Sequence, residues 1–178
     1  MNDYTRSRII EEAEALIAEK GVFGMSIGEL AERSRTSKGS VQYYFKTKQG
    51  IVEEAAKKSI LKISSGLLGW ADSVNSSASP KDVLGSLADA LLKDGTALRV
   101  FIAANSSVEP DTPLEEALDR ALSEWSSMLS AGAARLEAGF AAKMKRVAPA
   151  ILPFLCGLAV LNADPSYGRD ALTALIIG

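Results

Sequence analysis

The sequence contains no histidine and only one cysteine, Cys156, which lies in an apolar run. Without histidine the chain lacks the usual acid–base side chain, a serine–histidine triad and the commonest metal ligand. A single cysteine forms neither an internal disulfide nor a cysteine-rich metal site. We therefore expect that the protein is not an enzyme and that it holds no cofactor and no metal.

The chain also lacks a long uninterrupted apolar run and a strong net charge. Its longest apolar stretch, 147–161, contains two prolines and is shorter than the roughly 20 residues that span a bilayer. The opening segment 1–6 is mostly polar, so we expect no secretory signal, no membrane association and a cytoplasmic location. Because the net charge is −2, any contact with DNA must come from a local basic patch.

What the chain does have is helical periodicity. Apolar residues make up 47% of it, enough for a sizeable core, and they recur every three or four positions. We predict an all-α fold of about nine helices. The expected helices run up to Gly21, from Ser26 to Ser34, from Ser37 to Phe45, from Thr47 to Trp70, from Pro80 to Asp94, from Ala97 to Ser106, from Thr112 to Phe140 (the longest), from Pro149 to Asn162 and from Ser166 to Ile177.

Two short helices joined by a tight turn follow the first helix, a pattern typical of a helix-turn-helix. Charge supports this interpretation, because segment 33–48 contains five basic residues and no acidic one. Such a cationic patch suits contact with DNA phosphates, which supply most non-specific affinity. The basic residues are Arg33, Arg35, Lys38, Lys46 and Lys48.

The helix expected at 37–45 has an unusual composition for a packed helix. Only Val41 and Phe45 are placed to pack inward, which leaves positions 38, 39, 42 and 43 outward. Gly39 costs ~1 kcal/mol of helix propensity, a cost that is explained if the backbone must approach a base or phosphate closely. This helix is the predicted recognition helix.

These segments resemble the DNA-binding domain of the TetR (tetracycline-repressor) family over Thr5–Glu54. The resemblance rests on the segments 8–13, 19–21 and 26–31 and above all on 37–48, which reads SKGSVQYYFKTK. It implies a helix-turn-helix DNA-binding domain at 1–48, followed by a helical ligand-binding and dimerisation domain at 49–178. It further implies that Lys38, Gly39 and Gln42 face bases in the major groove. The phosphate contacts that it implies are Ser26, Ser37, Ser40, Tyr43, Tyr44 and Lys48, and we expect Arg35 to add a further one.

Three positions depart from the family pattern. Family members usually carry glycine where this chain has Arg35, a small aliphatic residue where it has Thr36, and often tyrosine where it has Gln42. Arg35 must then accept a left-handed conformation at a cost of ~1 kcal/mol. Gln42 can pair bidentately with adenine. DNA binding stays expected, but the operator sequence cannot be read from these residues.

The segment 149–162 is apolar nearly all round, so we expect it to be buried on all sides. One side can face the chain's own core and the other a second copy, which predicts a two-fold dimer interface from 149–162 and 166–177. A central helix in a monomer is the alternative. Two recognition helices would then read a near-palindromic operator. The predicted interface residues are Ile151, Leu155, Leu158, Leu172, Leu175 and Ile176.

A pocket for a small, largely apolar ligand is expected among the fourth to eighth helices. Its predicted residues are Trp70, Arg99, Phe101, Asn105, Trp125, Met128 and Phe154, although side chains with this spacing are more often core than ligand contacts. Together these features predict a transcriptional repressor that its ligand releases from DNA. The alternatives are a ligand-independent regulator or activator of the same fold, and a helical ligand-binding protein or enzyme with a vestigial DNA module.

Overall fold

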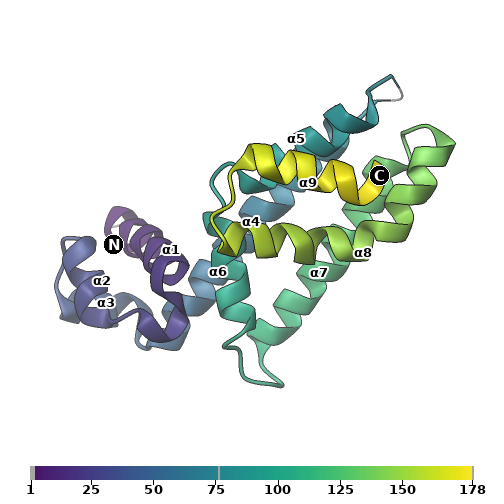
Figure 1. Ribbon diagram of the computed structural model, residues 1–178. Helices are drawn as coiled ribbons and strands as arrows, with labels where there is room; N and C mark the ends of the chain where they lie inside the picture. Colours follow the sequence, from purple (N-terminus) through teal and green to yellow (C-terminus); the bar gives the residue numbers. More distant parts are fainter. Residues whose placement is uncertain (1–2, 76, 178) are drawn as a thin grey trace.

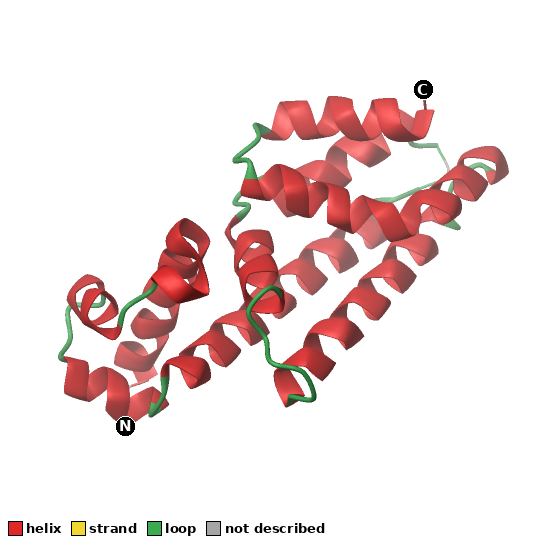
Figure 2. Cartoon of the chain, turned by 60° about the horizontal axis from the view of Figure 1, so that its bottom comes forward, coloured by secondary structure: helices red, strands yellow, loops and turns green. Residues whose placement is uncertain are grey.

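The computed structural model describes residues 3–75 and 77–177, and this part of the chain forms nine helices and no strand (Figures 1 and 2). The predicted all-α class is confirmed. Figure 1 shows α1–α3 gathered at one end, with α4 running from there into the group formed by the later helices. The helices are α1 (Asp3–Gly24), α2 (Ile27–Arg33), α3 (Lys38–Phe45), α4 (Lys48–Ser73), α5 (Pro80–Leu92), α6 (Thr96–Asn105), α7 (Pro113–Ala133), α8 (Ala138–Val160) and α9 (Pro165–Ile177).

Side-chain caps explain where most of these helices begin. The hydroxyls of Ser26, Ser37 and Thr47 each accept the backbone N–H three residues ahead, at 3.0–3.1 Å. Ser79 and Thr112 cap α5 and α7 in the same way, and a proline follows each of them. Each cap satisfies an N–H that has no partner within the helix. The starts of α2, α3, α4, α5 and α7 therefore agree with the prediction.

The predicted boundaries around α7 and α8 are wrong. The helix that begins after Thr112 ends at Ala133, and Leu136 and Phe140 lie in the following turn and in α8. The longest helix is α4, with 26 residues, rather than α7, with 21. Apolar residues keep their helical spacing across the turn at 134–137, so periodicity alone did not reveal the break.

Helix α8 begins at Ala138, well before the predicted start at Pro149, and continues through both Pro149 and Pro153. A proline inside a helix removes one hydrogen bond and leaves the carbonyl four residues earlier without its donor. The two carbonyls belong to Lys145, four residues before Pro149, and to Pro149, four residues before Pro153. All three residues are exposed. Water can reach these carbonyls, which reduces the cost of continuing the helix.

The later helices pack around two buried tryptophans. The indole N–H of Trp125 donates to the hydroxyl of Ser64 at 2.8 Å, and that of Trp70 donates to the carbonyl of Val83 at 3.0 Å. Gly132 permits the close packing of α7 on α4, because a Cβ there would lie 2.5 Å from the Trp70 ring. These contacts fix α5 and α7 against α4. Within residues 3–75 and 77–177, no helix combines the length and apolar character needed to cross a bilayer.

A buried carboxylate joins α1 to α4. The side chain of Glu14 is only 3% exposed, and its two oxygens lie 2.9 Å from the ammonium groups of Lys58 and Lys62. Both lysines belong to α4, the helix that leads from the N-terminal helices to the rest of the chain. Glu14 therefore ties the position of α1 to that of α4.

Candidate nucleic-acid interface

Helices α2 and α3 form a helix-turn-helix with a tight turn. The turn is closed by backbone bonds from Arg35 N–H to the Glu32 carbonyl, at 3.0 Å, and from Thr36 N–H to the Ala31 carbonyl, at 2.8 Å. Arg35 has a φ of 51°, the left-handed conformation that the sequence predicts where a glycine is usual. The turn thus keeps its shape at a backbone cost of ~1 kcal/mol.

Helix α3 packs through two side chains and exposes the rest. Val41 and Phe45 are buried, whereas Lys38, Gly39 and Gln42 are exposed, as predicted. The ring of Tyr43 is also exposed, and the half-buried Tyr44 meets it edge to face with 5.4 Å between ring centroids. The outward side of α3 therefore offers an amide, an ammonium group and a phenol to solvent. Contact of these groups with DNA stays a prediction.

Gly39 has no role in packing the protein itself. A Cβ at this position would meet only the Ser37 hydroxyl, at an ordinary contact distance of 3.7 Å. The chain therefore accepts ~1 kcal/mol of lost helix propensity at an exposed site without an internal reason. This observation supports a close approach of another molecule to α3.

The cationic patch is smaller than the sequence predicts. Arg33 is held by two carboxylates of α1, at 3.0 Å from Glu12 and 2.8 Å from Glu19. The hydrogen bonds that Arg33 donates to Glu19 lower the pKa of Glu19 and raise the pKa of Arg33. Arg33 thus fastens α2 to α1 and is a structural residue.

The remaining cations stay available on the surface. Within the described residues, Arg35, Lys38 and Lys46 form no ion pair, and all three are exposed. Lys48 donates one hydrogen bond, to the carbonyl of Phe23 at 3.3 Å, and can donate others. These four residues, Arg35, Lys38, Lys46 and Lys48, are named the basic cluster below.

The three predicted serine contacts lie at helix starts. Ser26 and Ser37 use their hydroxyl oxygens as caps, and the Ser40 hydroxyl lies 2.9 Å from that of Ser37. The first turn of α2 also lies close to the side chain of Lys38 in α3, because a Cβ on Gly28 would lie 3.1 Å from Cε of Lys38. The structure thus brings the first turns of α2 and α3 together, as an anion-binding surface requires.

The predicted ligand residues do not line the main cleft described below, and they differ widely in exposure. Trp70, Phe101 and Trp125 are buried, and the Phe101 and Trp125 rings pack with 4.8 Å between centroids. Arg99 bonds to the side-chain amide oxygen of Asn162 and, at 3.4 Å, to the Ala159 carbonyl. The other predicted residues are the exposed Asn105 and the half-buried Met128 and Phe154. Helical periodicity identified core side chains here but could not separate a packed core from a cavity wall.

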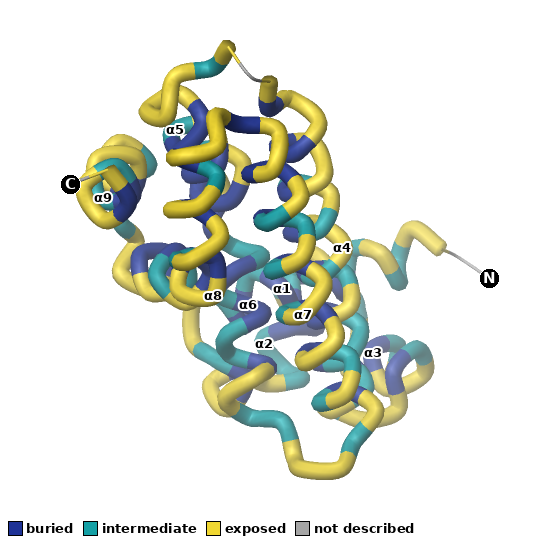
Figure 3. Tube along the Cα trace, turned by 90° about the vertical axis from the view of Figure 1, so that its right-hand side faces the viewer, coloured by how far each residue is buried: buried dark blue, intermediate teal, exposed yellow. Residues whose placement is uncertain are grey.

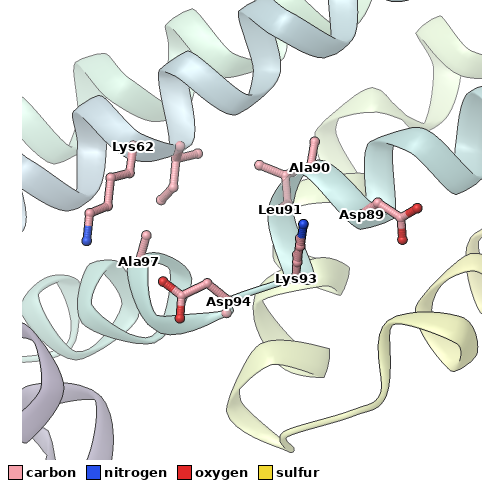
Figure 4. Close-up of a pocket in the computed structure, with 9 residues that line it drawn as sticks. Lys62, Asp89, Ala90, Leu91, Lys93, Asp94 and Ala97 are labelled. Atoms are coloured by element: carbon pink, nitrogen blue, oxygen red, sulfur yellow. The ribbon is translucent and has the colours of Figure 1, made fainter.

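A cleft of about 550 Å³ opens instead between α4, α5 and α6 (Figure 4). Figure 4 shows Lys62 of α4 and Ala97 of α6 on one side, with Ala90 and Leu91 of α5 on the other. The complete lining is Lys62, Ile63, Asp89, Ala90, Leu91, Lys93, Asp94, Gly95 and Ala97. Lys62 is also one of the two partners of Glu14, so the cleft lies next to the contact between α1 and α4.

The predicted dimer residues need correction. Of the six, only Leu175 is exposed, because the other five are buried in the chain's own core. The five buried residues are Ile151, Leu155, Leu158, Leu172 and Ile176. The opposite faces of α8 and α9 are the exposed ones (Figure 3). Apolar or small residues on these faces are Pro149, Ala150, Pro153, Gly157 and Val160 of α8, Leu161 at its C-cap, and Tyr167, Ala174, Leu175 and Ile177 of α9.

Two residues near the candidate interface carried no signal in the sequence. Phe23 is 86% exposed in the last turn of α1, after the kink at Gly21, and Arg6 lies over the Phe45 ring, 5.3 Å from its centroid. Arg6 also bonds to Glu54, which lowers the pKa of that carboxyl group. Neither periodicity nor charge pattern shows which apolar ring stays outside, so only the three-dimensional arrangement identifies these residues.

Comparison with known proteins gives a consistent result. Residues 9–55 match the family model described as "Bacterial regulatory proteins, tetR family". No curated protein sequence matches the chain. Several solved structures are similar to it in fold. A transcriptional regulator from Saccharomonospora viridis, in complex with choline, is 18% identical with a TM-score of 0.74, over 99% of this chain and 97% of that one.

Two further structures agree with this one over nearly their full length. A transcriptional regulator from Rhodococcus sp. Rha1 is 24% identical with a TM-score of 0.72, over 96% of this chain and 92% of that one. The TetR family transcriptional regulator PfmR from Thermus thermophilus is 20% identical with a TM-score of 0.69, over 97% and 96%. At these identities the similarity shows the fold.

Proposed function

Because this chain belongs to the TetR family and has the fold of a DNA-binding transcriptional regulator, we propose that it is a repressor that a small molecule releases from its operator. The observation that carries the DNA-binding part is the outward side of α3. It exposes Lys38, Gly39 and Gln42 next to the basic cluster. In this proposal residues 1–48 bind DNA, and residues 49–178 bind the ligand and a second copy.

Each exposed group of α3 and its surroundings has a role in the proposal. Lys38 and Gln42 contact base edges in the major groove, and Gly39 lets the backbone come close. The rest of the basic cluster, together with Ser26, Ser37, Ser40, Tyr43 and Tyr44, binds phosphates and so sets the position of α3 along the duplex. Arg33 has no part in this interface, because Glu12 and Glu19 neutralise it.

A two-fold homodimer supplies the second recognition helix. We propose that the exposed faces of α8 and α9 form the interface, with Leu175 retained from the prediction and Pro153, Gly157 and Leu161 added. Their support is a surface of small and apolar side chains with Leu161 76% exposed, which would be costly to leave in water. Gly157 has no neighbour within 4 Å of a Cβ, so a partner helix can approach closely there.

The cleft between α4, α5 and α6 is the proposed ligand site. Its volume of about 550 Å³ is in the range of small-molecule sites, roughly 300–1,000 Å³. Because Lys62 lines it and also contacts Glu14 of α1, a ligand there can shift α4 relative to α1. Such a shift would change the separation of the two recognition helices and favour the DNA-free state.

DNA binding is tested with duplexes selected from a randomised pool. Affinity is measured by fluorescence anisotropy over a range of salt concentrations. Lys48→Ala should weaken binding evenly across sequences and lower the salt slope by about one, whereas Gln42→Ala should change the preferred sequence. Wild-type behaviour of both variants would contradict the assigned contacts.

The ligand site is tested by filling it. Compounds that release the selected duplex from the wild-type protein are retested on Ala97→Trp, with the exposed Ala142→Trp of α8 as the control. We expect Ala97→Trp to bind DNA normally and to lose the response to the compound, and Ala142→Trp to keep both. A compound that still releases Ala97→Trp would place the ligand elsewhere.

A further inference from the structure

Phe23 is the most exposed of the large apolar side chains described, at 86%. Full burial of a phenylalanine ring is worth roughly 1.5–3 kcal/mol, and this ring gains almost none of it in the free protein. A single exposed apolar residue needs no explanation by itself. Its place in the fold, however, is next to two of the proposed phosphate contacts.

The last turn of α1, which follows a kink at Gly21, holds the Phe23 ring outward. Its neighbours Val22 and Met25 are buried, at 8% and 1% exposure, so the register of the turn is fixed on both sides of Phe23. Gly21 has a φ of 72°, which kinks α1 two residues before Phe23. Gly24 lies close to the part of α1 before the kink, where a Cβ would meet that of Lys20 at 2.8 Å. The ring is thus presented by an ordered turn.

The backbone of Phe23 lies close to two of the residues that are proposed to bind phosphates. Lys48 donates its ammonium hydrogen bond to the Phe23 carbonyl at 3.3 Å. Ser26, which caps α2, follows only three residues later. Phe23 therefore lies at the edge of the DNA-facing surface, between the first turns of α2 and α4.

We propose that the Phe23 ring packs against the deoxyribose surface of the duplex, between the phosphates bound by Ser26 and Lys48. This inference rests on the proposed function and adds an apolar anchor to it. Between phosphates, the DNA backbone presents the apolar C–H groups of its sugars, which a phenyl ring can cover. The contact is independent of sequence and releases no counterion, so it strengthens binding at every salt concentration.

The test measures salt dependence for Phe23→Ser, Phe23→Leu and two controls. Half-burial of the ring corresponds to about a four- to twelve-fold loss of affinity in Phe23→Ser, with the slope of log K against log salt unchanged. Phe23→Leu should recover most of the affinity. Lys48→Ala should instead lower the slope by about one. Leu61→Ser, which removes a 67% exposed apolar side chain of α4, should leave the affinity unchanged.

The outcomes separate this inference from the proposed function. A wild-type protein that binds no duplex would remove the proposed function. If the wild type binds and Phe23→Ser binds equally well, only the role of Phe23 is overturned. A changed salt slope in Phe23→Ser, or an equal loss in Leu61→Ser, would also overturn it. Thermal melting should show the same stability for Phe23→Ser and the wild type, because the ring is exposed in the free protein.

Discussion

Replacement of Glu14 by glutamine tests how α1 is held on α4. The side chain of Glu14 is 3% exposed and accepts from Lys58 and Lys62, each at 2.9 Å. The variant keeps the size of the side chain but loses its charge, so two charge-assisted contacts become weak or are lost. Hydrogen bonds to charged groups contribute about 1.5–3 kcal/mol each, but the two lysines regain water because they are 34% and 42% exposed. We expect the free energy of unfolding to fall by about 1–3 kcal/mol in total.

Glu11→Gln is the matched control for this prediction. Glu11 lies on the same helix and contacts the same Lys58, but at 3.8 Å and with its side chain 62% exposed. Such an exposed pair contributes about 0.2–1 kcal/mol at most. Urea denaturation of both variants, followed by circular dichroism, measures the difference. Equal losses in the two variants would refute the argument that burial makes Glu14 the dominant contact.

Two further predictions concern packing and pH. Gly132→Ala should lower stability by about 1–3 kcal/mol, because the new Cβ would lie 2.5 Å from the Trp70 ring. Gly69→Ala, where nothing lies within 4 Å, should raise it by about 0.5–1 kcal/mol, and urea denaturation that shows no such contrast would contradict the packing of α7 on α4. Burial raises the pKa of the Cys156 thiol from 9.0 to about 11. The unfolded chain therefore loses this proton first, and stability should fall between pH 9 and 11 relative to Cys156→Ala; equal pH dependence of the two proteins would contradict the burial of the thiol.

The parts of the fold that depend on local chemistry were predictable from the sequence. Ser26, Ser37 and Thr47 are caps because their hydroxyls replace a backbone partner within three residues, and this needs no knowledge of the rest of the chain. The outward side of α3 was predictable for a similar reason. With only Val41 and Phe45 to bury, the helix has one possible inner face.

The parts that depend on what an apolar face meets were not predictable. Trp125 and Ile151 have the spacing of buried residues, and both are buried. Periodicity, however, does not say whether the partner is the chain's own core, a ligand or a second copy. Trp70, Phe101 and Trp125 among the predicted ligand residues, and five of the six dimer residues, are therefore core. The same limit applies to charge, because the pairing of Arg33 with two carboxylates of α1 exists only in the folded chain.

The proposed placement of α3 in the duplex groove is tested most directly by hydroxyl-radical footprinting on a selected duplex at low ionic strength. The proposed dimer predicts two protected patches on one side of the DNA, with centres one helical turn or a multiple of it apart, about 10–10.5 base pairs per turn. Protection at both patches should weaken together in Lys48→Ala. A single patch, or no protection on any duplex offered, would contradict the paired recognition helices.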